Sequence, residues 1–187
     1  MIRSNIHTHS VYCDGKNTLS ELAEAAYSSG FTSLGFSSHA YTDFDTSFCM
    51  KRSDTEKYFE EADNLKKEYS GRLEIYKGLE YDIFSCEDIS QCDYIIGAVH
   101  YIRCGNDYLC VDESLEATKK IINEFFGGNA EKYAAAYFET MSSLAQNVKF
   151  DIVAHFDLVT KFNEKERLID TSSYAYKAAA TDALTQI

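Results

Sequence analysis

Short apolar or β-branched runs alternate with helical patterns along this chain of 187 residues. Stretches with helical spacing begin near Thr18, Asp54, Glu113, Asn129 and Ser172. Five runs have the length of strands, and they lie at residues 2–6, 31–36, 73–79, 94–99 and 150–154. Because predicted strands alternate with predicted helices, the pattern predicts a parallel α/β protein, either an open sheet or a barrel.

Local signals mark where several of these helices begin and end. The segment from Thr18 to Glu21 has the spacing of a capping box ahead of an apolar helix face. Gly30, Gly71 and the pair at 127–128 stand where helical spacing stops. These signals predict helices that start and stop within the single domain that we expect over residues 1–187.

All five histidines lie at the end of an apolar run or one or two residues beyond it: His7, His9, His39, His100 and His155. The remaining run, at 73–79, leads instead into Glu80. The carboxyl ends of parallel strands meet at one rim, where ligands bind. One histidine after a strand is more often a hydrogen-bonded loop residue, but five in this position predict a metal centre.

The pair His7 and His9 is the most informative part of this pattern. Residues two apart in a strand point to the same side, so both imidazoles can reach one ion. Asp14 follows closely and is a further candidate ligand, with a plain turn before Gly15 as the alternative. Glu80 is the carboxylate placed to bridge two ions, with a surface acid as the alternative.

Imidazole and carboxylate ligands suit zinc, manganese or iron. Two such ions bridged by Glu80 would hold a hydroxide and clamp a phosphoryl group. We therefore expect at least two divalent metal ions, with Glu80 and His100 acting in catalysis through the bound metals and a bridging hydroxide.

The net charge of −12 argues against a nucleic-acid partner held by a basic surface. A small phosphate-ester substrate is compatible with this charge, because bound divalent cations dominate the local field. The six cysteines form no C-x-x-C pair and are expected to be free thiols. Without a signal peptide or an apolar stretch of membrane-spanning length, we expect a cytoplasmic protein with no membrane partner.

Six segments resemble, in order, the motifs of the polymerase and histidinol phosphatase (PHP) superfamily. They are His7-Thr8-His9-Ser10, Tyr12-Cys13-Asp14-Gly15, Ser38-His39-Ala40, Gly78-Leu79-Glu80-Tyr81-Asp82, Ile96-Gly97-Ala98-Val99-His100 and His155-Phe156-Asp157-Leu158. Within this superfamily the chain is similar to the histidinol-phosphate phosphatases of the PHP type. The resemblance covers nearly the whole chain and is more specific for the superfamily than for the substrate.

The resemblance implies a distorted seven-stranded (βα) barrel with a trinuclear metal site. By motif position, His7, His9 and Glu80 would hold the first ion, and Asp14 and His39 would contribute to the third. Glu80, His100 and His155 would hold the second ion. The implied reaction is hydrolysis of L-histidinol phosphate to L-histidinol and phosphate in histidine biosynthesis.

One motif of the family is missing from this sequence: a strand near the C-terminus that ends in an Asp and a His. Asp170 and Asp182 do not replace it, because neither follows an apolar strand or has a partnering histidine. The expected barrel therefore lacks its last strands and has an open sheet edge. The chain is then a piece of a longer protein, a short form that pairs with a second copy to cover this edge, or a degenerate relative.

Contacts to the substrate are less well defined by the sequence. Lys161 and Arg103 are candidates for binding the phosphate, and each has an ordinary surface charge as the alternative. Asp82 would suit the amine of the substrate. Two other functions stay open at this point: a PHP phosphoesterase acting on another small phosphate ester, and a non-catalytic metal-binding fragment.

Overall fold

The computed structural model describes residues 3–187, so Ile2 at the start of the first apolar run lies outside the described part. The described chain forms two compact units. The first comprises residues up to Ile96 together with Phe150–Ile152, and the second comprises Gly97–Lys149 and Val153–Ile187. We describe each unit by itself.

A five-stranded sheet has the order β1-β2-β3-β4-β7, with neighbours in this order hydrogen-bonded. Its strands are β1 (Ser4–Asn5), β2 (Ser33–Phe36), β3 (Glu74–Asp82), β4 (Tyr94–Ala98) and β7 (Ile152–Val153). The pairs β1–β2 and β2–β3 are parallel, with Asn5 opposite Leu34 and Leu34 opposite Ile75. Four of the predicted runs contain one of these strands, and β3 overlaps the fifth run and extends three residues beyond it. The prediction of an α/β protein with parallel strands is confirmed.

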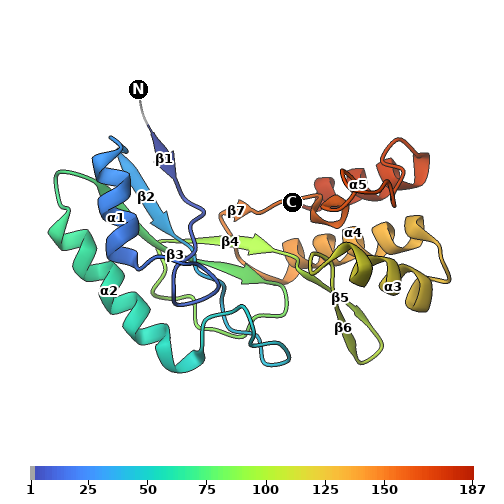
Figure 1. The fold of residues 1–187 in the computed structure, drawn as a ribbon, viewed down its shortest axis with the longest axis horizontal. Coiled ribbons are helices and arrows are strands. Elements are labelled where there is room, and N and C mark those ends of the chain that lie inside the picture. Colours follow the sequence, from blue (N-terminus) through green and yellow to red (C-terminus); the bar gives the residue numbers. More distant parts are fainter. Residues whose placement is uncertain (1–2) are drawn as a thin grey trace. The chain divides into compact units, whose positions relative to one another are not determined.

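Two helices cover the strands of the first unit, as Figure 1 shows. They are α1 (Leu19–Ser28) and α2 (Thr55–Glu68), the latter preceded by a 3-10 turn at Arg52–Asp54. The predicted capping box is present at α1: Glu21 N donates to Thr18 Oγ1 at 3.2 Å, and Thr18 N donates to Glu21 Oε2 at 2.9 Å. Apolar residues at helical spacing, such as Leu19 and Ala23, are fully buried against the sheet.

The second unit contains three helices and a hairpin. The helices are α3 (Leu115–Phe126), α4 (Ala130–Asn147) and α5 (Tyr174–Gln186), and a 3-10 turn spans Leu158–Thr160. All three begin within two residues of the predicted positions. Gly127 ends α3 in the left-handed conformation, at φ 61°, which glycine adopts without strain.

The hairpin of β5 (Tyr101–Cys104) and β6 (Asp107–Cys110) is antiparallel and was absent from the prediction. Its two-residue loop consists of Gly105 and Asn106, and Gly105 has a φ of 64°. A Gly-Asn pair between two short apolar runs is a hairpin signal. The sequence therefore contained the information, but each run is only four residues long.

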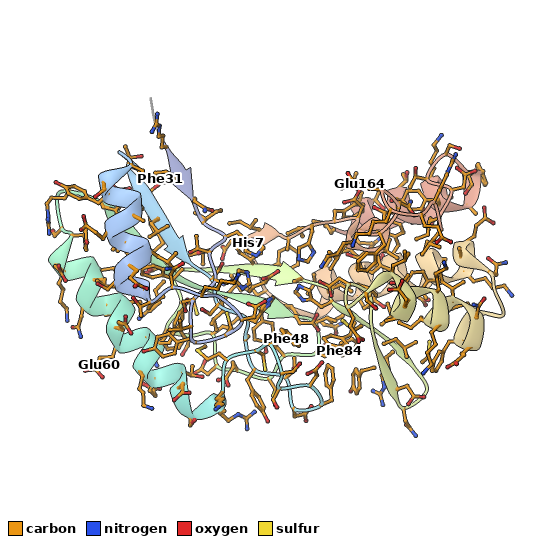
Figure 2. All side chains as sticks on the ribbon, in the orientation of Figure 1. His7, Phe31, Phe48, Glu60, Phe84 and Glu164 are labelled. Carbon is orange, nitrogen blue, oxygen red and sulfur yellow. The ribbon has the colours of Figure 1, made fainter. Side chains whose placement is uncertain are left out.

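Separate groups of apolar side chains fill the two units. In the first, Phe36, Tyr58 and Leu79 are fully buried between the sheet and the two helices, and Figure 2 shows side chains occupying this space. In the second, Tyr137 and Phe138 of α4 are buried, and Phe138 contacts Tyr176 of α5 edge-on at 5.2 Å between ring centroids. Among residues 3–187 no helix has the length and apolarity that a membrane span requires.

Candidate metal centre

Thr8 holds the segment from His7 to His9 in register beside β2. Its backbone N donates to Ser37 Oγ at 2.9 Å, its hydroxyl donates to Gly35 O at 2.6 Å, and its carbonyl accepts from Ser37 N at 3.0 Å. Since side chains alternate along an extended chain, His7 and His9 point away from Thr8. The hydrogen bonds of Thr8 thus direct both imidazoles to one side.

Glu80 on β3 contacts both of these imidazoles. Its carboxylate is 1% exposed, and Oε2 lies 2.9 Å from His7 Nε2 and 3.0 Å from His9 Nε2. His39 pairs with Glu80 in a parallel bridge just beyond β2, and its Nδ1 lies 3.3 Å from the same oxygen. One buried carboxylate oxygen therefore faces three imidazoles from neighbouring segments of the sheet.

Asp14 lies at the outer side of this cluster. Its Oδ1 is 3.2 Å from His9 Nδ1 and 3.9 Å from His39 Nε2, and its side chain is half exposed. The turn that carries Asp14 closes on Ser10, whose carbonyl accepts from the backbone N of both Cys13 and Gly15 at 3.0 Å. A side chain at Gly15 would place its Cβ 2.4 Å from the carbonyl carbon of His9, so the turn requires glycine.

Burial and hydrogen bonds within the cluster shift the pKa values of His9 and Cys13. Burial, the largest effect, lowers the pKa of His9, but its hydrogen bonds to Cys13 and Glu80 together raise it to about 10. Burial raises the pKa of the Cys13 thiol, and hydrogen bonds from His9 and Ser38 lower it overall. The cluster therefore favours positive charge beside Glu80.

The donor atoms of the first unit fall into two overlapping groups that can hold a cation. His7, His9 and Glu80 offer one ligand atom each within 4.8 Å of one another, and so do His9, Asp14 and His39. Nitrogen and carboxylate oxygen donors suit zinc and related divalent metals. A buried carboxylate also needs a compensating charge. The residues of the first unit thus fit a divalent metal ion.

The second unit brings His100 and His155 together. Their ring centroids are 4.9 Å apart, edge to face, and His100 is 6% exposed. Ala154 N donates to Gly97 O at 2.9 Å, which aligns the chain before His155 with the end of β4. Tyr137 Oη donates to the carbonyl oxygen of His155 at 3.2 Å. These two imidazoles are therefore presented side by side from neighbouring strand ends.

Lys161 and Arg103 have different surroundings in the second unit. Lys161 Nζ donates to the carbonyl oxygen and to Oδ2 of Asp112, at 3.1 and 3.0 Å. The guanidinium of Arg103 donates to Gly105 O at 3.0 Å and lies 5.5 Å from the centroid of the Tyr108 ring. Lys161 is thus fixed beside a carboxylate, whereas Arg103 is engaged within its own hairpin.

Asp112 is a residue that the sequence analysis missed. Burial raises the pKa of its carboxyl group, but the positive charges of His100 and Lys161 lower it overall. Asp112 follows Val111, whose backbone N donates to His100 O at 2.9 Å. An acid directly after an apolar run was the signal that identified Glu80, and the same rule applied to residues 109–111 would have found Asp112.

Three other acids named in the sequence analysis lie at the end of β3, in a turn and in a helix. Asp82 is 3% exposed, and its Oδ1 accepts from Phe84 N at 2.9 Å. Asp170 Oδ1 accepts from Ser172 N at 3.0 Å just before α5. Asp182 lies within α5, and its carbonyl accepts from Thr185 Oγ1 at 2.7 Å.

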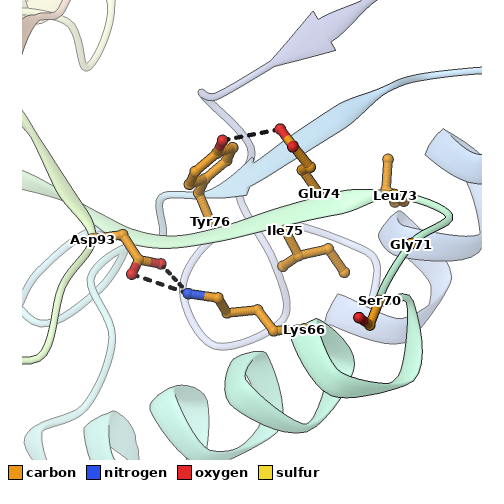
Figure 3. A pocket seen from close by; sticks show the side chains of 8 residues that line it. All are labelled: Lys66, Ser70, Gly71, Leu73, Glu74, Ile75, Tyr76 and Asp93. Carbon is orange, nitrogen blue, oxygen red and sulfur yellow. Dashed lines mark hydrogen bonds and ion pairs between the residues drawn. The ribbon is translucent and has the colours of Figure 1, made fainter.

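A pocket of about 400 Å³ lies elsewhere in the first unit, at the start of β3 (Figure 3). Lys66 of α2 reaches across it to both carboxylate oxygens of Asp93, at 3.0 and 2.7 Å. Tyr76 on its wall precedes Glu80 by four residues, which corresponds to roughly 13 Å along a strand. This pocket is therefore remote from the metal cluster.

Parallel strands that deliver imidazoles and a buried carboxylate to one edge define an α/β protein with a histidine-rich metal centre. The chain belongs to the PHP domain family, whose model matches residues 5–186.

Several known proteins are similar to this chain. It is 34% identical over 179 residues to the histidinol-phosphatase of Bacillus subtilis, a match covering 83% of this chain and 66% of that protein. It is 25% identical to a protein named probable histidinol-phosphatase in Schizosaccharomyces pombe, covering 86% of this chain and 57% of that protein. The chain thus spans somewhat less than two thirds of the length of these relatives.

Two crystal structures show a similar fold. The hisK protein of Listeria monocytogenes has a TM-score of 0.79 and 22% identity, covering 98% of this chain and 78% of that chain. Histidinol phosphate phosphatase from Lactococcus lactis, complexed with zinc, L-histidinol and phosphate, has a TM-score of 0.61 and 18% identity. That match covers 96% of this chain and 70% of the other.

Proposed function

We propose that this protein is a metal-dependent phosphomonoesterase that hydrolyses L-histidinol phosphate to L-histidinol and phosphate, a step of histidine biosynthesis. The observation that carries the proposal is the 1% exposed Glu80 carboxylate facing His7, His9 and His39. The names of the similar proteins from Bacillus subtilis and Lactococcus lactis support the choice of substrate.

Two to three divalent ions would be held by the residues that match the family's motifs. The two donor groups of the first unit support a first ion at His7, His9 and Glu80 and a third at Asp14 and His39. The assignment of His100 and His155, with Glu80, to a second ion follows from the order of the motifs. The seven-stranded barrel belongs to the same proposal. When bound, such metals polarise phosphoryl oxygens and generate a nucleophile from water at neutral pH.

The chain's own residues would bind and orient the ester. Lys161 is the better candidate for the phosphate, because its ammonium group is positioned by two oxygens of Asp112 and its side chain remains 45% exposed. An ammonium group that donates to a phosphate oxygen makes a charge-assisted hydrogen bond. Arg103 is a weaker candidate in this proposal, since its guanidinium already donates within the hairpin.

Phosphate release from three substrates tests the proposed activity. The metal-loaded protein is assayed with L-histidinol phosphate, p-nitrophenyl phosphate and a nucleoside monophosphate under the same conditions. We expect kcat/KM to be highest for histidinol phosphate. Equal and slow rates on all three would indicate another PHP phosphoesterase, and no release with zinc, manganese or iron would indicate a metal-binding domain without catalysis.

Replacing Lys161 by glutamine is expected to raise KM for histidinol phosphate with a smaller change in kcat. A hydrogen bond to a charged group contributes about 1.5–3 kcal/mol, which corresponds to roughly a 10-fold to 100-fold change in binding. Steady-state kinetics measures the change.

Lys165→Gln is the matched control for this variant, because the ammonium groups of Lys161 and Lys165 lie at nearly equal distances, 5.8 and 5.7 Å, from the ring centroid of Phe162. The two variants remove the same charge from the same neighbourhood. Equal kinetic effects of both would show that only general charge is involved and would contradict a direct role of Lys161.

A further inference from the structure

Tyr94 of β4 extends its ring over the adjacent strand β3 as far as β2. The residue is 9% exposed, and its hydroxyl oxygen lies 2.7 Å from the carbonyl oxygen of Ile6 and 2.9 Å from that of Phe36. Burial raises the pKa of Tyr94, so its hydroxyl keeps its proton and remains a donor. One side chain from β4 therefore reaches both β2 and the chain that continues beyond β1.

Two glycines make room for this ring. A Cβ at Gly35 of β2 would lie 2.4 Å from the hydroxyl oxygen and 2.9 Å from Cζ of Tyr94. A Cβ at Gly78 of β3 would lie 2.5 Å from Cε1 and 2.6 Å from Cζ of the same ring. Such distances are far below normal contact, so any side chain at either position would displace the ring. The two glycines and the tyrosine form one packed arrangement across three strands.

The arrangement involves the segments that lead into the metal ligands. Ile6 immediately precedes His7, Phe36 ends β2 three residues before His39, and Gly78 precedes Glu80 by two residues. The ladder between β1 and β2 ends at Asn5, so it does not fix the carbonyl of Ile6. At that point the carbonyl oxygens of Ile6 and Phe36 both accept from the Tyr94 hydroxyl and share its single proton.

We propose that Tyr94 is a positioning residue for the metal centre: together with the hydrogen bonds of Thr8, its hydroxyl sets the separation between the segment carrying His7 and His9 and the end of β2. This inference rests on the proposed metal centre but not on the identity of the substrate. Groups behind metal ligands that fix their orientation change metal affinity by about 10-fold to 100-fold when removed. Tyr94 does not contact the ligand side chains in this proposal but holds the backbone that carries them.

The conservative variant Tyr94→Phe tests this role, because it keeps the ring and removes the donor. Titration of the metal-free protein with cobalt(II) in the absence of substrate gives the dissociation constant and the visible spectrum of the bound ion. We expect the dissociation constant to rise about 10-fold and the spectrum to change, as the His7 and His9 ligands shift. A dissociation constant and a spectrum equal to those of the unmodified protein would overturn the proposal.

Tyr69→Phe is the matched control. Tyr69 is also buried in the first unit, at 4% exposure, and its hydroxyl donates to Glu24 Oε2 at 3.0 Å, away from the ligands. We expect this variant to melt at a lower temperature than the unmodified protein yet to bind cobalt(II) unchanged. If Tyr69→Phe weakened metal binding as much as Tyr94→Phe, the effect would be general destabilisation and the proposal would fall.

A second comparison tests the fit between ring and glycine. Gly35→Ala is expected to lower the melting temperature more in the unmodified protein than in the Tyr94→Phe background, because phenylalanine lacks the oxygen that the new Cβ would meet at 2.4 Å. Contacting residues give such non-additive effects. Equal decreases in both backgrounds would contradict the packing that the proposal requires. Metal binding and melting are measured without substrate. Their results can therefore be interpreted even if the proposed phosphatase activity is not found.

Discussion

Replacing Glu80 by glutamine is expected to abolish most metal binding in the first unit while leaving the protein folded. The change keeps the size of the side chain but removes the negative charge that His7, His9 and His39 share at 2.9, 3.0 and 3.3 Å. We expect metal affinity to fall by on the order of 100-fold or more, since even groups behind the ligands contribute 10-fold to 100-fold. Metal analysis after dialysis measures the number of ions that remain bound.

Phosphate release should decrease with metal content in the same variant. Removing one group that stabilises developing charge commonly costs about 100-fold to 1000-fold in rate. Glu87→Gln is the matched control: this carboxylate is also largely buried, at 8% exposure, and lies 3.8 Å from Arg52 instead of the histidines. Unchanged metal stoichiometry in Glu80→Gln would refute a ligand role for Glu80.

Substituting Gly15 by alanine should damage the turn that carries Asp14. The new Cβ would meet His9 C, His9 O and Ser10 N at 2.4 to 2.5 Å, and all three are backbone atoms that no rotamer change can move. The turn must then open, which separates Asp14 from His9. We expect a loss of about 3 kcal/mol in the free energy of unfolding, measured by urea denaturation, together with loss of a bound metal ion.

Gly30→Ala provides the comparison for this loss. Gly30 follows α1 with a φ of 72°, and a Cβ added there would have no other atom within 4 Å, so only backbone strain opposes alanine. A left-handed alanine costs roughly 1–2 kcal/mol. We expect Gly30→Ala to retain its full metal content. Retention of all metal by Gly15→Ala would show that the turn is not needed for the centre.

The acidic character of the chain bears on how these variants are assayed. A net charge of −12 disfavours the approach of an anionic ester, so bound cations would have to compensate locally. Variants that lose metal should therefore also lose affinity for phosphate. Measurements at low and at high ionic strength separate this long-range effect, which salt screens, from loss of the ligands themselves.

Local sequence patterns predicted most elements of the fold. Each apolar run coincides with or overlaps a strand, and the capping box at Thr18 and Glu21 forms as expected, because these signals depend on residues a few positions apart. The β5–β6 hairpin was not predicted because its two strands are only four residues each. Such strands are too short to show a clear alternation of apolar and polar residues. Its loop glycine, Gly105, was the one available signal.

The candidate ligands could be chosen from the sequence for a topological reason. Parallel strands end at the same edge, so His7, His9 and Glu80 could be assigned to one place from the order of the runs alone. Their individual roles as ligands remain predictions, as do the second ion at His100 and His155, the homodimer and the cytoplasmic location. Asp112 was missed because its strand belongs to the hairpin and not to the parallel series.

The sequence by itself determined the order of the elements and the chemical types gathered at the strand ends, since both follow from periodicity and spacing. Only the tertiary structure showed how those ends are held: Thr8 clamped to Ser37, the Gly15 turn closed on Ser10, and Tyr94 lying over Gly35 and Gly78. These contacts join residues up to 88 positions apart. Distances of a few ångströms between such residues depend on packing across several strands, which no local pattern encodes.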